Sequence, residues 1–177
     1  GFPMYYAMDH ASPPPRTGAS HATIYPYGPF LAGDGVSVML GLQNEREWLR
    51  FCDVVLLMPE LASDPRFNTN SLRNQNRLDL QNIILNVFAS LTANEVIQRL
   101  DDAPIANARM NSMDDLWAHP QLQARQRWTQ IDSPVGPLPA LLPPGVQSGF
   151  DYTMGPIPSV GQHNALILQE LGLTLAP

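Results

Sequence analysis

One stretch of this 177-residue chain, Arg16 to Asn44, gathers the side chains best suited to chemistry. It begins with a polar loop that contains Arg16, Gly18 and His21, and it ends in two amides, Gln43 and Asn44. An arginine guanidinium suits carboxylates and phosphates held in a fixed geometry, and amide side chains both donate and accept hydrogen bonds. These residues are therefore the first candidates for a binding site.

Asp34 is the only carboxylate inside this stretch, and Gly35 follows it. An Asp-Gly pair is typical of a tight turn far more often than of a catalytic acid. Residues 23–27 and 36–42 have the composition of strands, although Pro26 would confine the first to a sheet edge or end it. An antiparallel hairpin around Asp34 is the simplest interpretation.

Other catalytic arrangements find little support in the sequence. The four histidines are His10, His21, His119 and His163. They lie far apart, and none is followed four positions later by a second metal ligand, so we expect no metal site. The Gly-x-Ser-x-Gly elbow of many serine hydrolases is absent, which argues against a Ser-His-Asp triad.

The thiol content bears on both chemistry and location. Cys52 is the only cysteine, so an internal disulfide is excluded. Its place on an apolar helical face predicts a small core residue rather than a nucleophile. A single unpaired thiol is also typical of a reducing compartment, and we expect a cytoplasmic protein.

Charge and hydrophobic patterning argue against nucleic acid and membranes as partners. The formal net charge is -6, and the ten basic residues are all arginines scattered along the chain. A nucleic-acid groove needs clustered cations, so we expect no nucleic-acid partner and solvated arginine side chains. No apolar run approaches the roughly 20 residues that span a bilayer, which predicts a soluble globular protein without a membrane segment. Residues 1–8 are rich in aromatic side chains, and the chain does not begin with methionine, which we interpret as the start of a fragment.

Helices that would support the candidate stretch follow it directly. Asn44 and Glu47 have capping-box spacing, so Asn44 is expected to cap a helix. Apolar residues then recur every three or four positions and predict one buried face, made of Trp48, Phe51, Cys52, Val55 and Leu56. The clearest helical pattern covers residues 80–91, where the same spacing runs without a break.

A second capping pair, Thr92 and Glu95, predicts the next helix. Asp101 and Asp102 are expected just beyond its end, because the helix dipole disfavours anions in the last turn. Residues 105–110 then form either a short strand or an extended link.

The C-terminal third changes character. Ser112 and Asp115 mark a short helix, and residues 121–128 are expected to form one more. Residues 134–158 are rich in proline and glycine, which leaves room only for short strands and turns, and a last helix is expected within 159–172. The elements together predict an α+β fold, with a short antiparallel sheet, several helices and an extended segment that ends in a helix.

Ten short motifs follow one another along nearly the whole chain. They lie at residues 16–21, 25–30, 34–35, 41–48, 64–67, 74–77, 105–110, 119–122, 133–136 and 161–172. Their order and spacing resemble the class III CoA-transferase family, which includes formyl-CoA, carnitine-CoA and dicarboxyl-CoA transferases and the 2-methylacyl-CoA racemases. The Tyr-Pro-Tyr run at 25–27 and the pair Gln43-Asn44 favour the mesaconyl-CoA and succinyl-CoA branch.

The resemblance implies a division of the chain. Residues 1–23 would be a connector from an absent N-terminal domain of Rossmann-like fold, and residues 24–120 a small α+β domain. Residues 121–177 would be a return segment and a C-terminal helix that belong to the large domain. Two such proteins would interlock as a homodimer, so the partners of this chain include the N-terminal half of the same enzyme.

The resemblance also implies the reaction. An acyl-CoA thioester is the substrate, a carboxylic acid is the acceptor, and no cofactor is permanently bound. A nucleophilic aspartate forms an anhydride and then an enzyme-CoA thioester. That aspartate would belong to the absent half, so we assign no catalytic residue to this chain and expect the chain alone to be inactive.

The implied contribution of this chain is one wall of the site. At the position of Arg16, Gly18 and His21, family members carry a glycine-rich loop that closes over the intermediates. This chain departs from that pattern, with one glycine in place of several, and its His or Arg would instead meet an acyl carboxylate. Gln43 and Asn44 would form the other part of the wall. The racemases place a glutamate base near Asn44, and an amide cannot abstract an α-proton, which favours transfer over racemisation. Asn44 as a helix cap alone, a racemase-like enzyme, and an inert dimerisation or assembly module stay open as alternatives.

Overall fold

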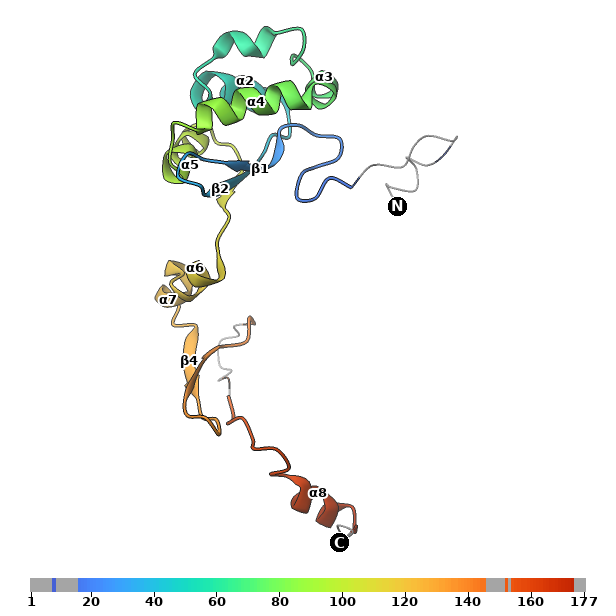
Figure 1. Cartoon of the computed structure of the whole chain (residues 1–177), viewed down its shortest axis with the longest axis vertical. Coiled ribbons are helices and arrows are strands. Elements are labelled where there is room, and N and C mark those ends of the chain that lie inside the picture. The colour runs from blue at the N-terminus through green and yellow to red at the C-terminus, as the bar shows by residue number, and fades with distance from the viewer. Residues whose placement is uncertain (1–7, 9–15, 146–151, 153, 174–177) are drawn as a thin grey trace. The chain divides into compact units, whose positions relative to one another are not determined.

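The structure is a computed structural model that describes Met8, residues 16–145, Tyr152 and residues 154–173 (Figure 1). It divides into two compact units, Gly1–Met110 and Asn111–Pro177. The assignment of residues 24–120 to a small domain and of 121–177 to a large domain stays a prediction. Within the described residues, no helix combines the length and the apolar character needed to cross a membrane.

A three-stranded antiparallel sheet organises the first unit. Its strands are β1 (Tyr27–Leu31), β2 (Ser37–Gly41) and β3 (Asn107–Arg109), in the order β1-β2-β3. The hairpin predicted around Asp34 is confirmed, with Phe30 opposite Val38. Strand β1 begins directly after Pro26 and lies at the sheet edge, where a proline interrupts no ladder.

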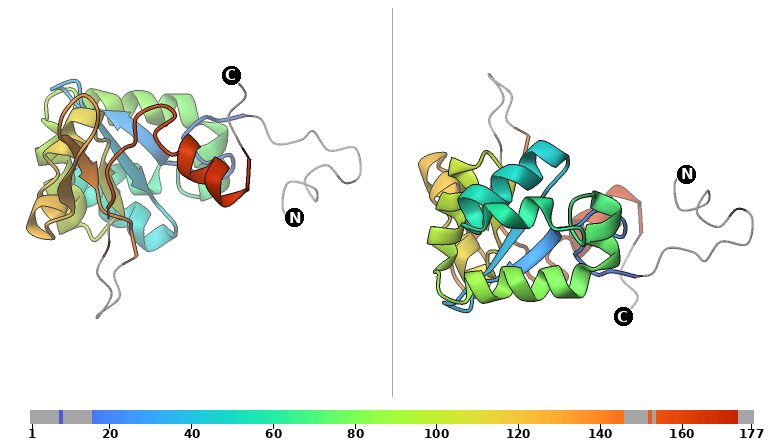
Figure 2. Two further views of the ribbon diagram at one scale, coloured as in Figure 1. Left: turned by 90° about the horizontal axis from the view of Figure 1, so that it is seen from below. Right: turned by 90° about the horizontal axis from the view of Figure 1, so that it is seen from above.

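Helical elements follow the hairpin in sequence. They are α2 (Glu45–Arg50), the π-helical turn η2 (Phe51–Val55), the 3-10 turn η3 (Pro59–Ser63), α3 (Asn70–Gln75), α4 (Arg77–Phe88) and α5 (Ala93–Asp102). The capping pair Thr92 and Glu95 begins α5 as predicted. Helix α3 was not predicted, because its residues are nearly all polar and carry no apolar period. Figure 2 shows from two further sides that α4 and α5 lie against the β1–β2 hairpin.

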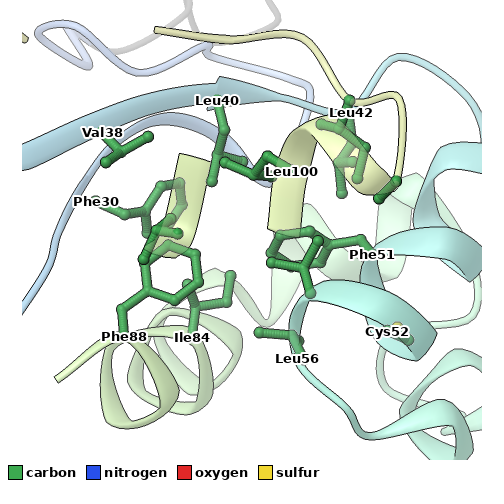
Figure 3. Packing of buried hydrophobic residues seen from close by; sticks show 14 of the residues in the cluster. Phe30, Val38, Leu40, Leu42, Phe51, Cys52, Leu56, Ile84, Phe88 and Leu100 are labelled. Carbon is green, nitrogen blue, oxygen red and sulfur yellow. The ribbon is translucent and has the colours of Figure 1, made fainter. Parts of the chain in front are cut away.

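One hydrophobic core joins the sheet to these helices (Figure 3). Phe30 from β1 meets Phe88 from α4 edge to face, with ring centroids 6.3 Å apart. Cys52 is fully buried in the same core, as its helical position predicted. Because strand residues alternate between faces, Val38 and Leu40 enter the core while their neighbours face the other side of the sheet.

Two sequence expectations in the first unit are wrong. Asp101 and Asp102 lie inside the last turn of α5 rather than beyond it. Each carboxylate accepts a hydrogen bond there, Asp102 from Gln98 at 2.9 Å and Asp101 from Asn107 at 2.8 Å, which offsets the unfavourable dipole. Nor are all arginines solvated, since Arg73 is only 2% exposed.

The second unit consists of short elements. They are α6 (Met113–Trp117), α7 (Pro120–Ala124), a hairpin of β4 (Trp128–Ile131) and β5 (Leu138–Leu141), and α8 (Asn164–Glu170). The helix expected over residues 121–128 is therefore wrong at its end, because Trp128 pairs with Leu141 and stacks on Trp117 at 4.5 Å. Arg127 is also buried, at 9% exposure. Among the residues described beyond Met110, no hydrophobic side chain belongs to the buried core.

The hairpin turn is tied to helix α5 by Asp34. Its carboxylate accepts hydrogen bonds from the N–H groups of Ala93 at 3.0 Å and Val36 at 3.1 Å. The bond from Ala93 is the main reason that the pKa of Asp34 lies below its ordinary value of 3.8. Asp34 is thus a structural carboxylate, in keeping with the turn predicted there.

This lowered pKa makes a pH-dependent prediction. A carboxyl whose pKa falls on folding stabilises the protein above its unfolded pKa, and this stability is lost as pH falls through the folded pKa. Asp34→Asn should therefore lower the urea midpoint at neutral pH, and its difference from wild type should shrink below about pH 4. A difference that stays constant from neutral to acid pH would contradict the ionic role of Asp34.

Candidate functional site

The polar loop of residues 16–21 is a turn that rests on strand β1. Ser20 N–H donates to Thr17 O at 3.1 Å, and the Thr17 hydroxyl donates to Ser20 O at 2.6 Å. Gly18 sits in this turn with φ of +62°, a conformation that favours glycine. A Cβ on Gly28 would lie 2.5 Å from Ser20 Oγ, so the absence of a side chain there allows the loop to pack closely.

His21 is held in a defined orientation. Its Nδ1 accepts hydrogen bonds from the N–H groups of Thr23 at 3.1 Å and Ile24 at 3.0 Å. Its ring stacks on Tyr27 with centroids 5.4 Å apart, and its backbone N–H donates to Tyr27 O at 3.0 Å. Because Nδ1 is an acceptor in this arrangement, Nε2 is the ring nitrogen left to meet a ligand.

The two amides at the end of β2 have different surroundings. Asn44 caps α2 as predicted: its Oδ1 accepts from Glu47 N–H at 3.0 Å, and its Nδ2 donates to Glu47 Oε1 at 2.8 Å. Gln43 contributes its backbone N–H, which donates to Glu47 Oε2 at 2.7 Å. Its side-chain amide makes no hydrogen bond to the described residues, so Gln43 is the amide with free hydrogen-bonding capacity.

The cap at Asn44 can be tested directly. Asn44→Ala should lower the free energy of unfolding by about 1 kcal/mol, because it removes the acceptor for the Glu47 N–H. Asn44→Ser keeps a capping oxygen and should cost much less. Urea denaturation of the two variants checks the cap, and equal losses in both would contradict it.

A buried arginine braces the base of this region. Arg73 donates from Nη1 and Nη2 to the Glu45 carboxylate at 2.9 and 3.0 Å, and from Nε to Tyr25 O at 3.1 Å. Nη1 also donates to Phe67 O at 3.0 Å, and the guanidinium lies 4.7 Å from the centre of the Trp48 ring. The bond from Arg73 holds the pKa of the Glu45 carboxyl below its ordinary value. Arg73 thereby fixes the first residue of α2 to the segment that leads into β1.

Two cavities flank Gln43. One, of about 220 Å³, is lined by Tyr27, Met39, Leu40, Gly41, Gln43, Ala106, Asn107 and Ala108. The other, of about 190 Å³, is lined by Ile24, Leu42, Gln43, Asn44, Glu45, Asn70 and Arg73. The structure thus connects His21, through its stacked partner Tyr27, to the cavity that contains Gln43. Arg16 is exposed, and neither it nor Gly18 lines these two cavities.

The arrangement is suited to binding rather than to nucleophilic attack. Burial raises the pKa of the Cys52 thiol to about 12, so it is inert at neutral pH. The Asp34 carboxylate accepts hydrogen bonds from backbone N–H groups at the hairpin turn, so it is not placed as a nucleophile. The cavity of about 220 Å³ offers an apolar sheet surface with a neutral hydrogen-bonding group, the Gln43 amide, beside it.

Comparison with known proteins gives this geometry a context. Residues 2–164 match the family described as CoA-transferase family III. The chain belongs to this family. Membership agrees with the resemblance found in the motifs, and the α+β fold agrees with that of a solved relative. Over 95% of this chain, which is 43% of the other, a CAIB/BAIF family protein from Brucella suis superimposes with a TM-score of 0.73 and 30% identity.

Curated members of CoA-transferase family III extend beyond this chain. An acyl-CoA transferase of Fusarium pseudograminearum is 34% identical over 165 residues, which are 89% of this chain and 35% of that protein. The succinate–glutarate CoA-transferase of Agrobacterium fabrum is 27% identical over 165 residues, or 90% of this chain and 40% of that protein. The human succinyl-CoA:glutarate CoA-transferase is 28% identical over 158 residues, which are 88% of this chain and 36% of that protein. The chain therefore spans well under half the length of these relatives.

Three residues near the site were not among the sequence candidates. Tyr27 counted toward strand composition and toward the Tyr-Pro-Tyr motif but not as a site residue, and Asn107 lay in a segment of undecided structure. Arg73 lies in a polar run, where hydrophobic periodicity gives no sign of burial. The alternation of β1 would have placed Tyr27 on the open face of the sheet once its first residue was known.

Proposed function

We propose that this chain is the C-terminal portion of an acyl-CoA:carboxylate CoA-transferase. The observation that carries the proposal is the family match over residues 2–164. Relatives named as transferases between succinyl-CoA and glutarate or mesaconate support dicarboxylic acids as the substrate class. Acyl-CoA is then a substrate, and the chemistry needs no permanently bound cofactor.

The proposed reaction exchanges one thioester for another. A carboxylate of the enzyme attacks the thioester carbonyl, breaks the C–S bond and forms a mixed anhydride while CoA leaves as thiolate. The thiolate attacks the enzyme's own acyl carbon, which releases the donor acid and leaves an enzyme-CoA thioester. The acceptor carboxylate and the returning thiolate then reverse these steps on the new acid. The attacking aspartate is assigned to the part of the enzyme outside this chain.

The proposed role of this chain is to form part of the site wall. His21 presents Nε2 at the end of a loop that is anchored to Tyr27, and Gln43 offers a free amide beside the neighbouring cavity. Arg16 and Gly18 belong to the same loop and would approach the acyl carboxylate from solvent. Asn44 contributes through the cap that fixes the position of Gln43.

The second unit exposes apolar side chains that would pack against another part of the enzyme. Helix α8 and the turn after it expose Leu166, Ile167 and Leu171, at 56%, 49% and 65%. Apolar surface without a core of its own is typical of a segment that packs on another part of a protein. We propose that this unit packs on the N-terminal part of the same enzyme, within a cytoplasmic homodimer.

The test uses the intact protein that carries this chain. Purified enzyme should transfer CoA from succinyl-CoA to glutarate or mesaconate, whereas the 177-residue chain alone should show no turnover. Absence of transfer by the intact protein with these and other carboxylic acids would overturn the proposal. Deuterium washout at the α-carbon of a 2-methylacyl-CoA would instead support racemisation, and turnover by the chain alone would show that the nucleophile lies within it.

A further inference from the structure

The cavity of about 220 Å³ beside Gln43 lies on the face of the sheet that points away from the core. Tyr27 pairs with Gly41 across β1 and β2, and Met39 pairs with Ala108 across β2 and β3. Residues directly opposite each other in an antiparallel pair point to the same side. Since Leu40, the neighbour of Met39, is buried in the core, Met39 and its partners line the open side.

The floor of this cavity is apolar and shallow. It consists of Met39 together with three small residues, Gly41, Ala106 and Ala108. A Cβ on Gly41 would lie 3.1 Å from atoms of the Tyr27 ring, so glycine allows the ring to rest against β2. The ring therefore forms one wall of the cavity, and its contact with the His21 ring joins that wall to the polar loop.

The rim of the cavity carries an uncharged polar group. The Gln43 amide is free of hydrogen bonds to the described residues. Asn107 also lines the cavity, but it is paired with Leu40, so its side chain points to the other side of the sheet, where Nδ2 donates to Asp101 at 2.8 Å and to Ile105 O at 3.0 Å. None of the described residues that line the cavity carries a carboxylate or a cation, so it suits a largely apolar ligand with a polar end.

Volume decides which part of an acyl-CoA fits. Sites for drug-sized ligands occupy about 300–1,000 Å³, and this cavity is smaller. That space is too small for the nucleotide of CoA and is adequate for a short acyl chain.

We propose that this cavity binds the short acyl group of the acyl-CoA substrate and that Met39 limits its length. The acyl carbons lie on Met39, Gly41 and Ala108, and the polar end meets the Gln43 amide. This inference rests on the proposed CoA transfer, and it assigns acyl-chain selectivity to the open sheet face of this chain.

The test compares acyl chain lengths in the intact enzyme. Met39→Trp, which fills the cavity, should lower kcat/KM for succinyl-CoA and glutaryl-CoA by about tenfold or more, and for acetyl-CoA by less than about threefold, because adding bulk to an apolar pocket discriminates by roughly 10–200-fold. Met39→Ala should shift the preference toward longer acyl chains. Leu31→Trp is the matched control, since Leu31 is an exposed residue of the same strand pair that lies outside the cavity.

Each outcome separates this inference from the proposed function. A wild-type enzyme that transfers no CoA overturns both. An active wild type whose Met39 variants change kcat/KM equally for all chain lengths, or no more than Leu31→Trp does, overturns the acyl cavity alone. Urea midpoints of the variants show whether a uniform loss reflects unfolding.

Discussion

Replacing Arg73 by methionine is expected to lower the free energy of unfolding by about 3 kcal/mol. Methionine fills a similar length of the core but donates no hydrogen bond. The carbonyls of Tyr25 and Phe67 would then be buried without a partner, and each such loss costs about 1–3 kcal/mol. The Glu45 side chain is 57% exposed, so its carboxylate can return to water and adds less to the cost.

Arg66 provides the matched control for this experiment. It forms an ion pair with Asp64 at 2.8 Å, and its side chain is 52% exposed. Arg66→Met should leave the urea midpoint nearly unchanged, because exposed ion pairs contribute little to stability. If Arg73→Met were no more destabilising than Arg66→Met, the bracing role of Arg73 would be wrong. Arg73→Lys should recover only part of the loss, since an ammonium cannot reproduce the fork to Glu45.

Local sequence rules succeeded where a short segment decides its own structure. The Asp34 turn and the caps at Asn44, Thr92 and Ser112 depend on side chains that bond within four residues, so spacing alone identifies them. The failures involve distant partners. Asp101 lies in the last turn of α5, where Asn107 donates a hydrogen bond to its carboxylate. Trp128 was expected in a helix but lies in a strand, because it pairs with Leu141, 13 residues later.

The candidate site shows the same limit. Position along the chain marked His21 and Gln43, and the motifs that resemble the family gave a reason to examine them. Their connection through Tyr27 depends on the register of β1 with β2, which pairs Tyr27 with Gly41. A shift of one residue would turn Tyr27 to the core, and the residue alternation within β1 alone does not fix that choice. What fixes it lies elsewhere in the fold, at the turn between the two strands.

Gly33→Ala is expected to test this anchor and to lower the free energy of unfolding by about 3 kcal/mol. The Gly33 N–H donates to Phe88 O at 3.0 Å and to Leu91 O at 2.7 Å, at the junction of α4 and α5. A Cβ at Gly33 would overlap the Ala89 carbonyl oxygen and lie 3.1 Å from Leu91 O. Because these neighbours are backbone atoms, the hairpin would have to move away from both helices.

Gly35→Ala separates this overlap from the general cost of losing a glycine in the turn. Gly35 has a φ of +80°, and a Cβ there would meet no described atom within 4 Å, so its substitution should cost only about 1–2 kcal/mol of backbone strain. In the intact enzyme, Gly33→Ala should also weaken acyl-chain selectivity, since a displaced hairpin moves Tyr27 and Met39 together. Equal losses of stability for the two variants would show that close packing at Gly33 does not hold the hairpin, and the register of the site wall would then depend on the core residues Phe30 and Val38 alone.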